Sequence, residues 1–256
     1  KHAEFALKAL EPSQAAALVS KLVNQKGLPN DGEGPLIKLI GTAGGESELA
    51  LLFNQLKTGG FDEASQPHVL NALIKAARLR SAWPTGSLSG LEQFIASKHS
   101  AIRDSAIQLA GAWKQAPLAS RLLELAVGGN DAAFDSLVQI RGGKVVKGLK
   151  ILAGPDQPLA TRQRAAQALG VINLKGSLPQ VIAVLVDSKE TAESLELWRS
   201  LLNGKGAGDI LAGGVMGAGL PKTVVMAGIR AAQEGGRNEN ALVESLARLH
   251  NISLLI

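Results

Sequence analysis

The chain contains no cysteine among its 256 residues. Without thiols it cannot form disulfide bonds, iron–sulfur clusters, thiolate zinc sites or the covalent attachment of a c-type haem. A cysteine nucleophile is excluded for the same reason. The absence carries no information on compartment, because exported and cytosolic proteins can both lack cysteine.

Aromatic residues are scarce, at 3% of the chain, and tyrosine is missing altogether. Carbohydrate clefts and grooves for single-stranded nucleic acid use exposed aromatic rings on which a sugar or a base stacks. The shortage of aromatic residues weakens both classes of function. Trp113 and Trp198 lie on apolar stripes of expected helices and are predicted to be core residues, whereas Trp83 is predicted to be a rim or a packing residue.

The chain also lacks a strong charge of either sign, since 27 basic residues face 22 acidic ones for a net charge of +5. No run of about five to eight basic residues, the kind typical of nucleic-acid patches, is present. This balance permits an acidic partner without requiring one. The longest apolar run, 210–220, is too short to span a bilayer, so no membrane span is predicted.

What the chain does have is a large apolar fraction, 46%, spaced with the period of a helix. Glu46–Lys57, for example, places Leu49, Leu52, Phe53 and Leu56 on one helical face. No segment alternates polar and apolar residues between hairpin turns, so no sheet is predicted. We expect an all-α fold of about fifteen or sixteen helices, arranged in antiparallel pairs of roughly thirty residues.

One stretch, 101–111, returns further along the chain at 161–170. Aligned without a gap, the two copies match Arg103 with Arg162, and the offset is 59 residues, close to two helix pairs. A fainter copy lies at 136–142. Self-similarity at a fixed period indicates stacked repeats, in which each pair buries its apolar flanks against its neighbours. The sequence therefore predicts a single α-solenoid over residues 1–256, with about seven or eight pairs.

The repeated pattern is a β-branched residue followed by arginine, with a small residue three positions later and glycine at the end. Its residues are Ile102, Arg103, Ala106, Ala110 and Gly111 in one copy, and Thr161, Arg162, Ala165, Leu169 and Gly170 in the other. This pattern resembles HEAT repeats of the short, roughly thirty-residue kind. The resemblance implies a right-handed superhelix whose second helices line a concave face. It also implies packing roles for the recurring positions, namely Arg103, Ala106, Gly111, Arg162, Ala165 and Gly170.

A narrower resemblance concerns the first residues, KHAEFALKALEP, and the loop AGPDQP at 153–158. Both look like the helical-repeat region of large exported proteins of planctomycetes and verrucomicrobia, which joins a sugar-dehydrogenase-like domain to a c-type haem domain. It implies an extracytoplasmic connecting scaffold, with any redox chemistry in other domains. The chain starts at Lys1 and ends on an apolar stretch, so we expect it to be part of a longer polypeptide.

Five arginines are candidates for contact with a partner. They fall on expected second helices or at their ends, and they are Arg78, Arg80, Arg164, Arg199 and Arg230. Together they would make a basic groove for an acidic protein segment, a polyanionic glycan or nucleic-acid phosphates. Acidic residues on the same helices, Glu196 and Glu234 among them, dilute the positive field.

No catalytic or cofactor motif is present in the sequence. The four histidines, His2, His68, His99 and His250, are far apart and form no metal-binding pair on one helix. The glycine-rich segments 141–148 and 204–209 match neither the dinucleotide-binding nor the P-loop spacing. We therefore predict no catalytic residue, no metal site and no cofactor, and a protein that is not an enzyme.

Three functions remain open from the sequence. The first is a non-enzymatic scaffold that binds a protein partner, or neighbouring domains of its own polypeptide, through the concave face. The second is a nucleic-acid-binding protein of the DNA-glycosylase-like kind that uses the concave arginines. The third is an accessory segment of an exported c-type-haem or sugar-dehydrogenase-like oxidoreductase. The compartment is open, with an extracytoplasmic location favoured by the second resemblance.

Overall fold

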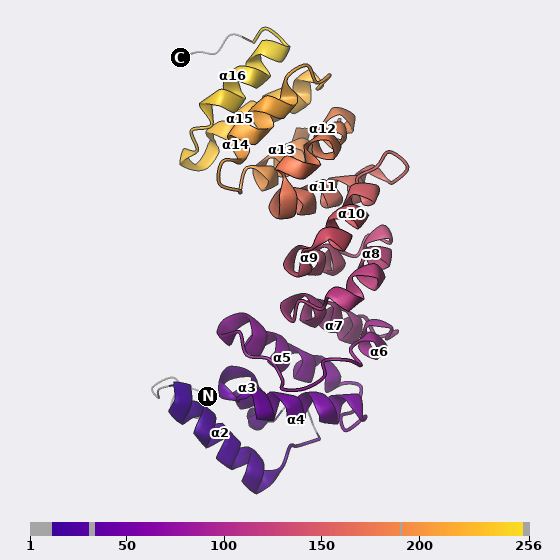
Figure 1. Ribbon diagram of the computed structural model, residues 1–256, viewed down its shortest axis with the longest axis vertical. Helices are drawn as coiled ribbons and strands as arrows, with labels where there is room; N and C mark the ends of the chain where they lie inside the picture. The colour runs from indigo at the N-terminus through magenta and orange to yellow at the C-terminus, as the bar shows by residue number, and fades with distance from the viewer. Residues whose placement is uncertain (1–11, 31–33, 190, 253–256) are drawn as a thin grey trace. The chain divides into compact units, whose positions relative to one another are not determined.

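The computed structural model describes residues 12–30, 34–189 and 191–252. Within these ranges it contains fifteen α-helices and three short 3-10 helices, and no strand (Figure 1). The predicted all-α class is confirmed. None of the described helices combines the length and the apolar character that a membrane span requires. The helix expected near residues 3–10 lies outside the described residues.

The chain divides into two compact units, residues 1–118 and residues 119–256, which we call the N-terminal and the C-terminal unit. The helices of the N-terminal unit are α2 (Pro12–Lys26), α3 (Pro35–Ala43), α4 (Glu46–Lys57), α5 (Gln66–Arg80), α6 (Glu92–Ile95) and α7 (Ser100–Ala112), followed by η1 (Ala116–Leu118).

Two layers of helices make up the N-terminal unit. Helices α3, α5 and α7 pack side by side in one layer, while α2, α4 and α6 each pack against a member of it. The core between the layers contains the rings of Phe53 and Trp113, whose centroids lie 4.9 Å apart in an edge-to-face contact. Edge-to-face packing aligns the positive edge of one ring with the negative face of the other. Trp113 is 1% exposed, which confirms its predicted place in the core.

The described residues of the C-terminal unit form nine α-helices and two 3-10 helices. They are α8 (Ala119–Val127), α9 (Asp131–Ile140), α10 (Gly143–Leu152), α11 (Leu159–Asn173), η2 (Lys175–Ser177), α12 (Leu178–Asp187), α13 (Thr191–Leu201), α14 (Ala207–Val215), α15 (Lys222–Gln233), η3 (Glu234–Gly236) and α16 (Asn240–Leu249).

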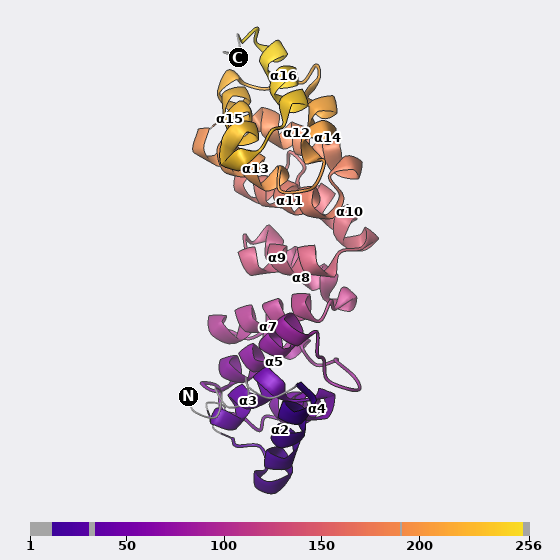
Figure 2. The ribbon, with the colours of Figure 1, turned by 90° about the vertical axis from the view of Figure 1, so that its left-hand side faces the viewer.

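Second helices pack on second helices in this unit. Helix α9 packs on α11, α11 on α13 and α13 on α15, while the first helices α8 and α10, α12 and α14, and α14 and α16 pack on one another (Figure 2). Trp198 on α13 is fully buried, as predicted, and its Nε1 donates a hydrogen bond to the carbonyl oxygen of Val224 over 3.0 Å. This bond joins two neighbouring second helices.

Local sequence signals set the starts of several helices. Asn130 precedes α9, and its side chain accepts a hydrogen bond from the backbone nitrogen of Ala133 over 2.9 Å. The Glu48 carboxylate of α4 accepts one from the backbone nitrogen of Gly45 over 2.8 Å. Such bonds satisfy N–H groups that have no partner within the first helical turn. The observed bounds of α4 equal those predicted from the sequence.

One helix is much shorter than predicted. The sequence pattern indicates a first helix over 87–97, but α6 covers only Glu92–Ile95. The preceding segment forms a bend in which Gly90 has a φ of 96°, outside the helical region. The backbone nitrogen of Gly90 donates to the Glu92 carboxylate over 3.0 Å, which starts the helix two residues later. The apolar spacing of the segment survives because Leu91, Phe94 and Ile95 are still buried.

Candidate functional site

The two recurring arginines lie in different surroundings. Arg162, at the start of α11, is buried, and its Nε donates to the carbonyl oxygen of Ala153 at the end of α10 over 3.3 Å. Its Nη2 donates to the carboxylate of Asp187, the last residue of α12, over 2.6 Å. Arg162 therefore connects three consecutive helices. Arg103 is one-third exposed, and its nearest acidic group is the adjacent Asp104, 3.5 Å away.

The small residues of the repeated pattern lie at close helix contacts. Ala106 and Ala165 are fully buried, and Gly111 is buried within α7. A Cβ atom added to Gly170 of α11 would lie 2.7 Å from Cδ2 of Leu201 on α13. Small side chains at these points let adjacent helices approach each other closely.

Arg164, one of the candidate partner-binding residues, is held by the preceding second helix. Its Nε lies 2.7 Å from the carboxylate of Asp131, and its Nη2 lies 3.4 Å from that of Asp135. The guanidinium also lies over the ring of Phe134, 5.8 Å from the centroid. All three partners belong to α9, so the charge of Arg164 is paired with carboxylates of a neighbouring helix.

Arg199 and Arg230 are brought together by one carboxylate. Glu234 lies 2.8 Å from Arg199 Nη2 and 2.6 Å from Arg230 Nε, and Arg199 also pairs with Glu196. Hydrogen bonds from Arg199, and then from Arg230, lower the pKa of Glu234. The hydrogen bond to Glu234, and to a smaller extent the one to Glu196, raises the pKa of Arg199. These directions are those expected when opposite charges stabilise each other's ionised forms.

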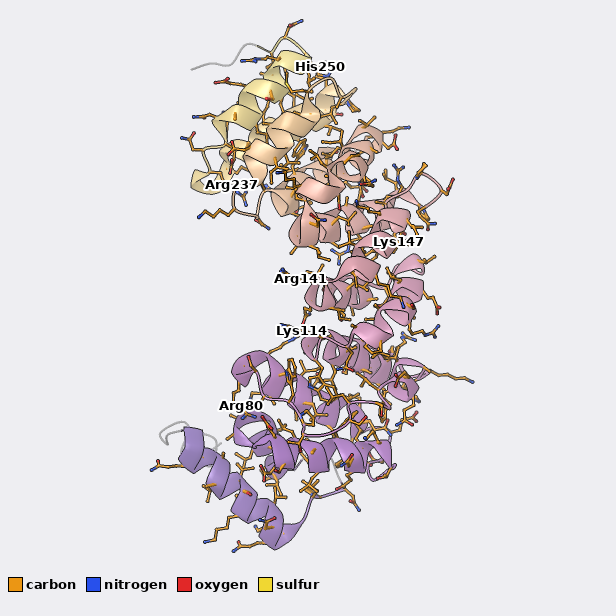
Figure 3. All side chains as sticks on the ribbon, viewed as in Figure 1. Arg80, Lys114, Arg141, Lys147, Arg237 and His250 are labelled. Carbon is orange, nitrogen blue, oxygen red and sulfur yellow. The ribbon has the colours of Figure 1, made fainter. Side chains whose placement is uncertain are left out.

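The remaining two candidates lie on α5 in the N-terminal unit. Arg78 is exposed. Arg80 sends Nη2 toward the carbonyl oxygens of Ile40 and Gly41, 3.4 and 3.5 Å away, near the end of α3 (Figure 3). Desolvation by burial lowers the pKa of Arg80. Carbonyls at a helix C-terminus carry partial negative charge, so Arg80 is placed to stabilise α3.

An open pocket of about 800 Å³ lies in the C-terminal unit, where the end of α9, the length of α10 and the end of α11 meet. Its cations are Arg141, Lys147 and Lys150, and Figure 3 labels the first two. Its apolar side chains are Val146, Ile151 and Ile172, and its lining contains no acidic residue. We call this surface the basic pocket.

The turn between α9 and α10 shapes one end of the basic pocket. Arg141 has a φ of 59° and Gly142 a φ of 91°, so the chain reverses within two residues. Helix α10 then begins at Gly143 without a side-chain cap. Along α10 the lysines recur every third residue, at Lys144, Lys147 and Lys150. Lys150 donates to the carbonyl oxygen of Gly176, which fixes it beside the end of α11.

The basic pocket has a sequence signal that the predicted arginine set does not include. Residues 136–186 contain seven basic side chains and one acidic one, a net charge of +6 in a chain whose total is +5. The positive charge is therefore concentrated in this segment. The predicted arginines lie on second helices or at their ends, whereas Lys144, Lys147 and Lys150 belong to a first helix.

His99 and His250 each have a polar partner, and neither partner is a histidine. His99 contacts Glu63 over 2.9 Å, and His250 lies 2.8 Å from the carbonyl oxygen of Leu220. Among the described residues no three His, Asp or Glu side chains are gathered in a way that suits a metal ion. His2 lies outside the described residues. Trp83 is 38% exposed, and it is the one tryptophan not enclosed by the core.

No protein-family model matches the chain, and no curated protein or solved structure matches it.

Proposed function

We propose that the chain is a non-enzymatic α-solenoid scaffold of the HEAT-like kind. In this proposal it binds a partner protein, or a neighbouring domain of its own polypeptide, on the exposed face of its second-helix layer. The observation that carries the proposal is the stacking of α9, α11, α13 and α15, each on the one before it. Stacked repeats present an extended surface that suits a macromolecular partner.

The contacts between neighbouring repeats support the same proposal. Polar links connect residues roughly one helix pair apart, as in Arg162 with Asp187, Arg164 with Asp131, and Trp198 with Val224. A chain tied together by such neighbour contacts is quasi-one-dimensional. Its stability then comes from stacking, which leaves the outer faces of the helices free to vary with the partner.

The nucleic-acid alternative has less support. Three of the arginines on which it depends, Arg164, Arg199 and Arg230, already bind carboxylates of this chain. Two of the three tryptophans are buried and offer no platform for a base. A mobility shift on duplex DNA that weakens with salt would favour this alternative over the scaffold. The accessory role in an exported oxidoreductase stays a prediction, to be tested by the sequence of the parent polypeptide.

Site-specific photo-cross-linking tests the scaffold proposal. Met226 on the second helix α15 is 47% exposed, and Val127 on the first helix α8 is 51% exposed, so the two positions form a matched pair. We expect a photoreactive amino acid at position 226 to capture a partner protein in the producing cell, and the same residue at position 127 to capture none. Cross-linking from both positions equally, or from neither, would contradict the proposal.

A purified system then checks that the captured partner binds this face. Met226→Asp is expected to weaken its binding at least about tenfold, because a charge would be desolvated in the interface. Val127→Asp introduces the same charge on a first helix and should leave the dissociation constant unchanged. Equal effects of the two substitutions would show that the second-helix face is not the binding surface.

A further inference from the structure

Cations in the C-terminal unit fall into two groups. Arg121, Arg162, Arg164, Arg199, Arg230 and Arg248 each have a carboxylate at ion-pair distance. Among the cations that have none within the described part of the chain, Arg141 and Lys147 line the basic pocket, and Lys144 lies between them in the sequence. The pocket therefore keeps a positive field that the chain itself does not neutralise.

We propose that the basic pocket binds a short, extended, acidic segment of a partner protein, with one apolar side chain of that segment seated between Val146, Ile151 and Ile172. This inference adds a second binding site to the proposed function. It rests on that function in one respect, namely that the partner is a protein. The site differs from the second-helix face, because most of its lining comes from the first helix α10.

The spacing of the charges fits a segment of chain better than a single anion. The cations run from Arg141, before the first residue of α10, to Lys150 in its last turn. A helix of this length covers about 15 Å, which an extended peptide spans with about five residues. Alternating acidic side chains on such a peptide would meet successive lysines while its backbone follows α10.

The apolar part of the lining selects among acidic partners. Val146, Ile151 and Ile172 give the pocket an apolar wall beside its cations, and no aromatic ring lines it. Nucleic acid would bring only phosphates to a surface without a stacking platform. A membrane surface would meet the exposed lysines but would not fill a concave pocket with a single side chain. An acidic peptide with one aliphatic residue satisfies both the charged and the apolar parts.

Fluorescence anisotropy with a defined probe tests the charged part. The probe is a short labelled peptide of glutamates around one central leucine, added to the full chain at about 0.1 M salt. We expect the double variant Arg141→Gln/Lys147→Gln to bind it roughly tenfold more weakly, at about two- to fivefold for each charge. The double variant Lys189→Gln/Lys222→Gln removes the same net charge from exposed positions outside the basic pocket. It should change binding by less than about twofold.

A second arm tests the apolar part. Ile151 is 64% exposed, so Ile151→Ser leaves the fold intact, and Val127→Ser is the control outside the pocket. With the unmodified chain, replacing the central leucine of the peptide by serine should weaken binding about three- to tenfold. In Ile151→Ser this penalty should shrink, because the leucine loses one of the three side chains that enclose it. In Val127→Ser it should persist.

The outcomes separate the possible occupants. Equal weakening in both charge variants, or an unchanged leucine penalty in Ile151→Ser, would overturn the proposal. So would the absence of peptide binding while a single-stranded oligonucleotide or a phosphatidylserine vesicle binds through Arg141 and Lys147. If cross-linking at position 226 fails while the peptide binds normally, only the proposal of a binding surface on the second helices is refuted. If cross-linking succeeds while the peptide does not bind, only the proposal for the basic pocket is refuted.

Discussion

Arg162 and Asp187 form an ion pair in which one partner is buried and the other is half exposed. The guanidinium is 8% exposed, the carboxylate is 50% exposed, and the two are joined over 2.6 Å. The pair connects the start of α11 to the end of α12, while Nε of the same arginine holds the end of α10. The side chain at the start of α11 is thus held by groups from the helices before and after it.

Removing the carboxylate of this pair should destabilise the C-terminal unit. Asp187→Ala leaves a nearly buried guanidinium with one backbone acceptor, at an expected cost of about 1–3 kcal/mol in the free energy of unfolding. Glu124→Ala breaks the exposed pair with Arg121 and should cost less than about 1 kcal/mol. Urea denaturation followed by circular dichroism measures both. Equal costs for the two variants would contradict the buried role of Arg162.

Glu234 is expected to make stability depend on pH on the acid side. Its pKa in the folded chain is lowered, mainly by Arg199. Its contribution is therefore fully present above the unfolded pKa of about 4.3, and it is lost as pH falls through the lower, folded value. Glu234→Gln should reduce the drop in Tm between neutral pH and about pH 3. In an NMR titration, Arg199→Gln should move the Glu234 pKa back up, and an unmoved pKa would show that the pair does not cause the shift.

Two helical glycines should respond in opposite ways to the same substitution. A Cβ atom at Gly41 of α3 would lie 2.8 Å from the backbone oxygen of Ala72 on α5, and backbone cannot rotate away. Gly41→Ala should therefore cost about 1–3 kcal/mol. Gly213 of α14 is exposed with nothing within 4 Å of such an atom, so Gly213→Ala should stabilise by about 0.5–1 kcal/mol. Thermal denaturation of both variants checks the signs, and a stabilising Gly41→Ala would refute the close approach of α3 and α5.

The two buried tryptophans offer a comparison at nearly constant size. Trp198 Nε1 donates to Val224, whereas Trp113 Nε1 has no hydrogen-bond partner among the described residues. Trp198→Phe removes the hydrogen bond to the Val224 carbonyl oxygen, whereas Trp113→Phe loses no hydrogen bond. We expect Trp198→Phe to cost about 1 kcal/mol more than Trp113→Phe in chemical denaturation. A larger cost for Trp113→Phe would contradict the difference in their bonding.

Sequence alone determined the helical class and most of the helix bounds. The stripe of Leu49, Leu52, Phe53 and Leu56 defines α4, and the Asn130 cap defines the start of α9, because both signals act within one or two helical turns. The same local reasoning failed at α6, where the bend at Gly90 overrides the apolar spacing. The burial of Trp113 and Trp198 also followed from the apolar stripes.

Only the tertiary structure decided which cations remain available to a partner. Arg164, Arg199 and Arg230 were selected on the sequence as partner-binding residues, yet each is paired with a carboxylate, in two of the three cases one that lies more than one helix away. Helical periodicity predicts contacts between residues three or four positions apart, whereas ion pairing between different helices depends on how the helices pack. The concentration of basic residues between 136 and 186 can be seen in the sequence. That Lys147 and Ile172 line the same pocket depends on the packing of α10 against α11.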